Sequence, residues 1–290
     1  MPRSAPAPDR FTRFVAIDWS GAKGARHRGI AMASCGTGDD APDLVTPPDS
    51  KPWSRAAVLE WLLERADEPM LVGFDFSFSA PFVARGAHLP GETDTADACG
   101  LWRYVDAHSD DPDLGAAGFL EARRGRHFYL GAADGAKRDF LHWRVCETGE
   151  DQTTKPSTVY DAIGAAQVAK ASFAGMRLLH RLDRRIAIWP FDPVPAKGAL
   201  VVEIYTAIAA RAAGMRKGVS KLRTAEALDK ALTAFGARPH RPLTHYDDHA
   251  TDASLASAWL RTHVRHAGLW RPARMTDAIA RSEGWTFGVP

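Results

Sequence analysis

Five acidic residues lie in or next to apolar segments, where a carboxylate is energetically unfavourable. Their types and spacing are typical of a site that binds a cation. Asp18 and Asp75 each end a short apolar run, RFVAID and MLVGFD, and Glu203 lies inside the apolar run ALVVEIY. Asp248 and Asp252 are four residues apart in a segment with helical spacing. A buried carboxylate costs several kcal/mol unless it has a cation, a metal ion or hydrogen bonds as partners. Taken singly, each acid is explained as well by a solvated position or a turn cap.

Together the acids point to a metal site. In an α/β sheet the carboxyl ends of neighbouring strands open into one crevice, so acids that end such strands repel each other unless a cation lies between them. Mg²⁺ and Mn²⁺ are hard cations that take oxygen ligands. We therefore predict a Mg²⁺ or Mn²⁺ site whose candidate ligands are Asp18, Asp75, Glu203, Asp248 and Asp252. Three roles remain open for Glu203. It could be a fourth metal ligand, a hydrogen-bond acceptor that orients a ligand, or a residue that serves the structure only.

The two acids of the last helical segment are expected to differ in role. Asp252 lies three residues before Leu255 and seven before Trp259, so it shares the stripe that must face the sheet. Asp248 is one turn earlier, at or near the helix N-terminus, where first-turn N–H groups stabilise a carboxylate without any metal. Asp252 is therefore the expected catalytic ligand, and Asp248 can serve as a cap.

Short apolar runs and helical periodicity predict the elements that must position these acids. The first four strands and one helix follow the order β-β-β-α-β, which is an α/β pattern. The predicted strands cover residues 13–18, 29–34, 44–45, 70–75, 186–189 and 199–205. The predicted helices cover residues 54–66, 159–182, 222–235 and 248–263. Ser54 is the expected N-cap of the first helix.

The segment from about residue 77 to 185 is predicted to be an insertion on the main sheet. It contains clusters of Gly and Pro, an acidic patch and the basic stretch RRGRH. The long helix predicted within it has an apolar packing face formed by Ile163, Ala166, Phe173, Met176 and Leu179.

Composition limits the class of protein. The chain has 290 residues, 45% of them hydrophobic and 25% charged, with a net charge of +2. These values exclude a disordered or collagen-like chain. The net charge is too small to produce the strong positive electrostatic field that is typical of an obligate nucleic-acid binder. No charge-free stretch approaches the ~20 residues that span a bilayer, so no membrane association is expected. The N-terminus lacks the apolar core of a signal peptide, which predicts a flexible tail over 1–12 and a cytoplasmic protein.

The order of these pieces resembles the ribonuclease H-like fold. More closely, the chain resembles the family called domain of unknown function 429, whose members are predicted ribonuclease H-like nucleases. The resembling stretches are VAIDWSG (15–21), VGFDFSFSAPF (72–82), KPSTVYDAIGAAQVAKASFAGM (155–176), IWPFD (188–192), VVEIYTA (201–207), DDHATDASLASAW (247–259) and EGWTFG (283–288). The resemblance implies a single domain over 13–290, built on a mixed five-stranded sheet flanked by helices, with a large mainly helical insertion.

The resemblance also implies an activity, the metal-dependent hydrolysis of phosphodiester bonds. Asp18 matches the first-strand acid, Asp75 the fourth-strand acid, and Asp248 with Asp252 the last-helix acids of the Holliday-junction-resolvase-like members. Those members usually carry Glu at the fourth strand and space their helix acids by three residues. The implied catalytic residues are Asp18, Asp75 and Asp252. Two ions ~4 Å apart would bind the scissile phosphate, activate water and stabilise the leaving oxygen.

Contacts to substrate are less specific. Lys23, Arg177 and Arg181 are candidates for phosphate binding, although such residues more often belong to a solvated surface. Ser20 is expected to shape a turn, because no His lies at a recognisable spacing to activate it.

Other functions remain open from the residues. One is a non-catalytic module that binds nucleic acid or another partner, and a second is an actin-like nucleotide phosphohydrolase that uses DWSGAKG to hold phosphate. A zinc site would rest on His245, Asp248, His249 and Asp252. The choice between DNA and RNA as substrate, and the formation of a homo-oligomer, are also left open.

Overall fold

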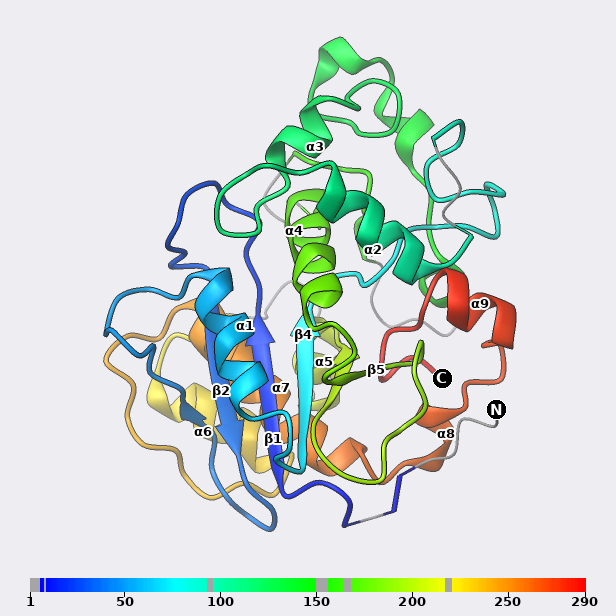
Figure 1. Ribbon diagram of the computed structural model, residues 1–290. Coiled ribbons are helices and arrows are strands. Elements are labelled where there is room, and N and C mark those ends of the chain that lie inside the picture. The colour runs from blue at the N-terminus through cyan, green and yellow to red at the C-terminus, as the bar shows by residue number, and fades with distance from the viewer. Residues whose placement is uncertain (1–5, 8, 93–95, 150–155, 164–167, 217–220) are drawn as a thin grey trace.

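The computed structural model of the chain describes residues 6–7, 9–92, 96–149, 156–163, 168–216 and 221–290 (Figure 1). Its centre is a mixed, mostly parallel sheet with the strand order β3-β2-β1-β4-β6-β5. The strands are β1 (Arg13–Asp18), β2 (Ala31–Cys35), β3 (Asp43–Leu44), β4 (Met70–Asp75), β5 (Ala187–Trp189) and β6 (Leu200–Glu203). β2 runs antiparallel to β1 and β3 antiparallel to β2, whereas β1, β4, β6 and β5 are parallel.

The sheet has six strands, so the five-stranded sheet implied by the resemblance is wrong, whereas each of the six strands predicted from apolar runs is present in part or in full. The additional strand is β5, a three-residue edge strand that pairs with β6 from Ala187 opposite Leu200 to Trp189 opposite Val202. The α/β class and the order of the first four strands agree with the sequence.

Helices cover both faces of the sheet. They are α1 (Arg55–Glu64), α2 (Ala98–Ala107), α3 (Ala117–Glu121), α4 (Val168–Arg181), α5 (Thr206–Ala212), α6 (Ala225–Thr233), α7 (Asp248–His263), α8 (Ala267–Trp270) and α9 (Asp277–Ser282). Short 3₁₀ turns occur at Ala132–Asp134, Lys137–Phe140 and Val145–Glu147. None of the helices within the described residues is long and apolar enough to span a membrane.

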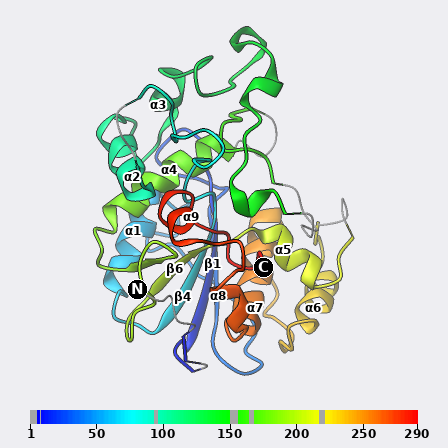
Figure 2. The same ribbon diagram turned by 90° about the vertical axis from the view of Figure 1, so that its right-hand side faces the viewer.

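Helices lie on the two sides of the sheet (Figures 1 and 2), and alternation of side chains along the strands separates two hydrophobic cores. Val15 and Ile17 of β1 belong to the cluster that contains residues of α1 and α4. Phe14 and Ala16 belong to the cluster with residues of α5, α6 and α7. Because successive side chains of a strand point to opposite faces, Asp18 follows Phe14 and Ala16 toward the face covered by α7.

Local capping signals place the helix starts. The Ser54 side chain accepts a hydrogen bond from the backbone N–H of Ala57 at 3.0 Å, as expected for the N-cap of α1. α7 has the predicted bounds, but its N-cap is Asp247, which accepts from the Ala250 N–H at 2.8 Å. The cap is therefore one residue earlier than Asp248.

The insertion over residues 77–185 forms the upper part of the molecule in Figure 1. It is less regular than expected, since its described part combines α2, α3, α4 and the 3₁₀ turns with long connecting segments. α4 begins at Val168 and not near Val159, and Ile163 lies before it with 37% exposure. Ala166 is outside the described residues, whereas Phe173, Met176 and Leu179 are buried as predicted.

Hydrogen bonds attach the insertion and the N-terminal segment to the rest of the protein. Asp113 of the insertion accepts from the backbone N–H of Arg55 at 2.9 Å and lies 2.8 Å from Nε2 of His27. Near the N-terminus, the Arg10 guanidinium donates to the carbonyl oxygens of Pro195 at 2.8 Å and Gly198 at 2.7 Å. Arg10 belongs to the segment predicted as a flexible tail over 1–12, and these hydrogen bonds join it to the loop before β6.

Candidate functional site

Asp18 and Asp75 are neighbours at the carboxyl ends of the two central strands. β1 and β4 pair in parallel with Asp18 directly opposite Asp75, and adjacent strands of a sheet are ~4.8 Å apart. Residues that face each other in a parallel pair point to the same side of the sheet. The prediction that these two carboxylates lie side by side is confirmed.

Helix α7 brings a third carboxylate to the same place. It packs closely over β4 at Gly73, where an added Cβ would lie 2.9 Å from Leu260 and 2.7 Å from Ile204. The absence of a side chain at this position lets the helix approach the sheet. Asp252, in the second turn of α7, consequently adds to the negative potential at both Asp18 and Asp75.

The three carboxylates are partly buried and repel one another. Burial, together with the charges of Asp18 and Asp252, raises the pKa of Asp75 to about 8. Burial and the charge of Asp18 raise the pKa of Asp252 to about 7. Burial also raises the pKa of Asp18, although the hydrogen bond with His249 opposes that rise. The negative charge of this carboxylate cluster, Asp18, Asp75 and Asp252, is therefore only partly compensated by protein groups.

Two side chains orient the carboxylate cluster. The Thr206 hydroxyl, at the start of α5, donates to Oδ2 of Asp75 at 2.8 Å. Nδ1 of His249 lies 3.1 Å from Oδ2 of Asp18, and this contact raises the pKa of His249. From the sequence, His249 is a candidate zinc ligand and the residue that lies three before Asp252, and Thr206 is not singled out. Thr206 lies just after the strand predicted over 199–205 and at the start of α5. This position at a strand end is the one sequence feature that could have indicated a role for Thr206 near the carboxylates.

Ser20 has the turn role expected of it, since its Oγ accepts from the Ala22 N–H at 3.2 Å. The fold nevertheless brings a histidine to the same turn. An added Cβ at Gly29 would lie 3.2 Å from Ser20 Oγ and 3.4 Å from Nε2 of His249. This proximity is long-range, so it has no signature in residue spacing.

Asp248 belongs to an ion-pair cluster. Its carboxylate lies 2.8 Å from Nζ of Lys221 and 2.8 Å from Nη2 of Arg223. Partial burial works against ionisation, but these cations hold the pKa of Asp248 below its ordinary value. The charge of Asp248 is thus already compensated, in contrast to that of Asp252, and this favours Asp252 as the helix ligand.

Glu203 is engaged in a buried network. Its Oε2 accepts from Nη1 of Arg144 and from the Phe78 N–H, both at 2.7 Å, while Oε1 accepts from Arg144 and Thr286. In the sheet Glu203 faces Phe74, so its side chain lies on the opposite side from that of Asp75. Of the three roles left open, these contacts favour a structural group over a metal ligand.

The predicted phosphate contacts lie elsewhere. Arg177 is 6% exposed, with Nε 3.1 Å from Oδ1 of Asp106, and Arg181 lies 2.8 Å from Oδ2 of the same residue. Both arginines thus join α4 to α2. Lys23 borders a separate pocket of about 180 Å³ that Lys170 also lines. The expectation that Arg177 binds substrate is wrong because its guanidinium is used inside the insertion.

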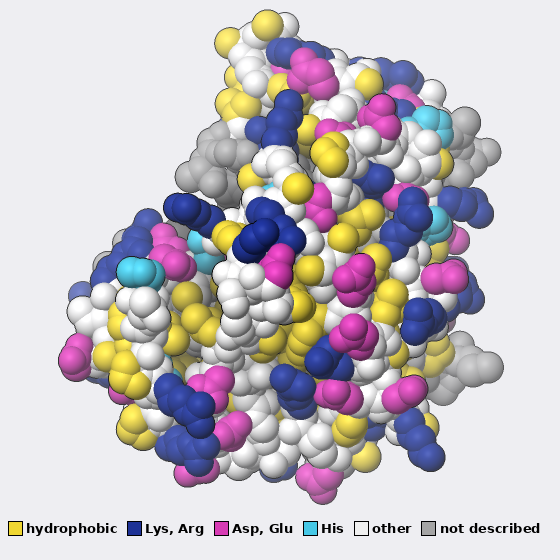
Figure 3. All heavy atoms as spheres, turned by 60° about the vertical axis from the view of Figure 1, so that its left-hand side comes forward, with side chains coloured by type: hydrophobic (Ala, Val, Ile, Leu, Met, Phe, Trp, Pro, Cys, Tyr) yellow, Lys and Arg dark blue, Asp and Glu magenta, His cyan; other side chains and the backbone are white. Residues whose placement is uncertain are grey.

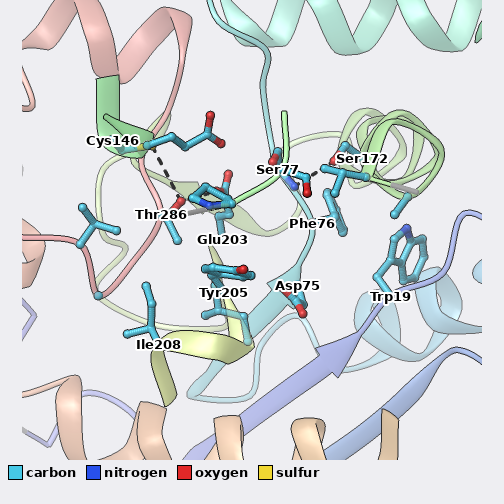
Figure 4. Close-up of a pocket in the computed structure, with 18 of the residues that line it drawn as sticks. Trp19, Asp75, Phe76, Ser77, Cys146, Ser172, Glu203, Tyr205, Ile208 and Thr286 are labelled. Carbon is cyan, nitrogen blue, oxygen red and sulfur yellow. Dashed lines mark hydrogen bonds between the residues drawn. The ribbon is translucent and has the colours of Figure 1, made fainter. Parts of the chain in front are cut away.

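A cavity of about 360 Å³ opens beside the carboxylate cluster. Figure 4 shows Asp75 and Trp19 on one side of it, Ile208 and Cys146 on the other, and the ring of Tyr205 between them. Hydrogen bonds fix parts of its wall: Ser172 Oγ accepts from the Ser77 N–H at 3.1 Å, and Cys146 Sγ lies 3.8 Å from Thr286 Oγ1 (Figure 4).

The donor chemistry of the carboxylate cluster suits a hard divalent cation, because it offers partly buried carboxylate oxygens whose charge is incompletely compensated. No set of three His, Cys, Asp or Glu side chains is already arranged to hold a metal ion, as far as the described ranges show. Ligation would therefore require side-chain adjustment within the cluster.

Comparisons of the chain with protein-family models, with curated proteins and with solved structures found no match. Inferences about function therefore rest on the sequence and on the site described above.

Proposed function

We propose that this protein is a Mg²⁺- or Mn²⁺-dependent phosphodiester hydrolase with Asp18, Asp75 and Asp252 as its metal ligands. The observation that carries the proposal is the register of the central strands, which sets Asp18 opposite Asp75 beneath the helix that bears Asp252. Three partly buried carboxylates that lack a full set of cationic partners are destabilising, and bound divalent cations would compensate them.

The topology supports a ribonuclease H-like fold as part of the proposal. An antiparallel β1-β2-β3 unit continues into the parallel strands β4 and β6, and acids end the first and fourth strands. This is the arrangement implied by the sequence resemblance. β5, which exceeds the five strands implied by the resemblance, is the edge strand next to β6 and is separated from Asp18 of β1 by two strands.

The residues around the site have separable tasks. Asp18, Asp75 and Asp252 would hold the cation, which when bound supplies Lewis acidity and lowers the pKa of coordinated water. Thr206 fixes one oxygen of Asp75, and His249 orients Asp18. Networks of this kind keep ligands in place before the cation arrives.

The test combines metal binding with cleavage. Mn²⁺ affinity and hydrolysis of single-stranded DNA, single-stranded RNA, duplexes and bis-(p-nitrophenyl) phosphate are measured for the wild type, Asp18→Asn and Asp248→Asn. We expect Asp18→Asn to abolish metal-dependent hydrolysis while the circular dichroism spectrum is retained. Asp248→Asn is the matched control, since it removes a carboxylate whose charge is already paired.

Hydrolysis that is absent from every substrate with either metal, in protein shown to be folded, would contradict the proposal. Salt-sensitive binding of nucleic acid without turnover would then favour the non-catalytic module. Release of phosphate from nucleoside triphosphates without strand cleavage would favour the phosphohydrolase.

A further inference from the structure

The cavity beside the carboxylate cluster is larger than a metal site requires. Its volume of about 360 Å³ falls in the ~300–1,000 Å³ range of pockets that hold small organic ligands. The carboxylates account for only part of its wall. Much of the remainder is apolar and is formed by Trp19, Phe76, Val168, Tyr205, Ile208 and Val289.

The ring of Tyr205 is available to a ligand. Tyr205 is half-buried at the N-terminus of α5, and its ring lies between Asp75 and Ile208 in Figure 4. It stacks on no other ring and its hydroxyl makes no hydrogen bond within the described residues. Burial beside Asp75 raises the pKa of Tyr205, so the ring is a neutral phenol. An aromatic face that lacks a partner at a cavity wall suits a planar ligand.

Trp19 contributes a buried hydrogen-bond donor to the neighbourhood of the cavity. This residue also lines the cavity, and its side chain is 5% exposed. Its indole Nε1 is buried and has no hydrogen-bond partner among the described residues. A buried donor without an acceptor is unfavourable, and an ordered water or a polar ligand atom within reach of Nε1 would satisfy it.

The wall formed by residues 286–289 is held in place. The Phe287 N–H donates to the carbonyl oxygen of Glu203 at 2.8 Å, and Trp285 Nε1 donates to that of Val289 at 2.9 Å. Gly288 packs so closely that an added Cβ would lie 2.7 Å from the Trp259 ring. Pre-formed walls are typical of small-molecule sites.

The described residues that line the cavity include few basic side chains that could bind the phosphates of a long nucleic acid. Of the described residues that line it, Arg144 is paired with Glu147 and Glu203, and His249 contacts Asp18. On the face shown in Figure 3, acidic and basic side chains are interspersed and form no single basic track. A phosphate would therefore be held by the cation on the carboxylate cluster, and the remainder of the ligand by apolar and stacking contacts.

We infer that the cavity receives one unstacked nucleotide, with its phosphate at the carboxylate cluster and its base on the ring of Tyr205. The inference rests on the proposed function, since the acids attract a phosphate only with a divalent cation in place. A base that is paired and stacked inside a duplex cannot enter such a pocket. The substrate class is therefore a free nucleotide or the end of a single strand, and not an intact duplex or a branched junction.

The first experiment is calorimetry on the full chain with three probes: thymidine, thymidine 5′-monophosphate and 2-deoxyribose 5-phosphate, each with Ca²⁺ and with EDTA. Stacking of one base is worth ~1–3 kcal/mol, so thymidine 5′-monophosphate should bind roughly 5- to 150-fold more tightly than the sugar phosphate. Thymidine should bind equally with and without Ca²⁺. Tyr205→Phe should keep the difference, and Tyr205→Leu, which keeps apolar bulk but loses the ring, should remove most of it.

The second experiment needs no variant and distinguishes the source of the nucleotide. An oligonucleotide with terminal 2-aminopurine is added as a single strand and as a blunt duplex, and stacking on Tyr205 should quench the fluorescence of the single strand only. Binding of the monophosphate without any effect on the oligonucleotide assigns the site to free nucleotides.

Three results would overturn the inference: equal affinity for the monophosphate and the sugar phosphate, unchanged affinities in Tyr205→Leu, or equal quenching with the duplex. Failure of the proposed function has a different signature. In that case thymidine binds as expected, but Ca²⁺ adds nothing to the affinity for the monophosphate.

Discussion

Replacing Asp75 with Asn should stabilise the metal-free protein at alkaline pH. The pKa of Asp75 rises from 3.8 to about 8 in the folded chain, and one pKa unit corresponds to about 1.4 kcal/mol. Ionised Asp75 therefore costs the folded state on the order of 5 kcal/mol. Asn keeps the shape of the side chain and can still accept the hydrogen bond of Thr206, but it carries no charge.

The sign of the pH dependence follows from proton binding. Between about pH 4 and pH 8 the folded protein holds a proton on Asp75 that the unfolded chain has released, so the stability of the wild type falls as pH rises through this window. We expect Asp75→Asn to raise the free energy of unfolding by about 2 to 6 kcal/mol at pH 9, and by about 1 to 2 kcal/mol at pH 5.

The assay is urea unfolding in EDTA at pH 5, 7 and 9, monitored by tryptophan fluorescence. Asp248→Asn is the control, because its carboxylate is paired with Lys221 and Arg223 and its removal should not stabilise the protein at pH 9. Adding Mn²⁺ should narrow the difference, since a ligand at 100 times its Kd stabilises the wild type by about 2.7 kcal/mol. If Asp75→Asn is less stable than the wild type at pH 9 in EDTA, the carboxylate cluster is not electrostatically frustrated and the reasoning is wrong.

Three further predictions concern the surroundings of the carboxylate cluster. Asp252→Asn should weaken Mn²⁺ binding at least about tenfold, whereas Asp248→Asn should leave it within about twofold; isothermal titration at pH 7.5 would show the reverse if the wrong helix acid has been chosen. Thr206→Val should lower Mn²⁺ affinity by roughly tenfold because Asp75 loses its orienting hydrogen bond, and Thr206→Ser, which keeps the hydroxyl, should restore it; equal affinities in the two variants would refute this role. Gly73→Ala should cost about 1 to 3 kcal/mol of stability and weaken Mn²⁺ binding, since the new Cβ would lie within 3 Å of two side chains. Gly268→Ala, where an added Cβ meets nothing within 4 Å, should leave both the melting temperature and the affinity nearly unchanged.

The sequence alone determined the elements whose signals are local. β1 and β4 are continuous apolar runs that end in Asp, and both have the predicted bounds. Ser54 caps α1 as expected, and α7 has the predicted bounds because its periodicity is carried within a single segment. Alternation along a strand and the 3.6-residue period of a helix depend on neighbours in the chain, so they can be read without knowledge of the fold.

The partner of each charged side chain was decided by the tertiary structure. Position within the helix distinguishes Asp252 from Asp248, but it does not show that Asp248 is paired with Lys221 and Arg223 or that Asp252 lies near Asp18. Such contacts join residues that folding brings together from different elements, and residue spacing contains no information about them.

The tertiary structure also determines which charged side chains can be buried, because it brings each of them next to a partner of opposite charge. Glu203 is neutralised by Arg144, 59 residues earlier in the chain, and Arg177 is held by Asp106 from another helix. Sequence analysis identified Glu203 as unusual because an acid lies in an apolar strand, but it could not identify the cation that compensates it. A buried charge has a low free energy only beside its partner, and the position of that partner is a property of the folded chain.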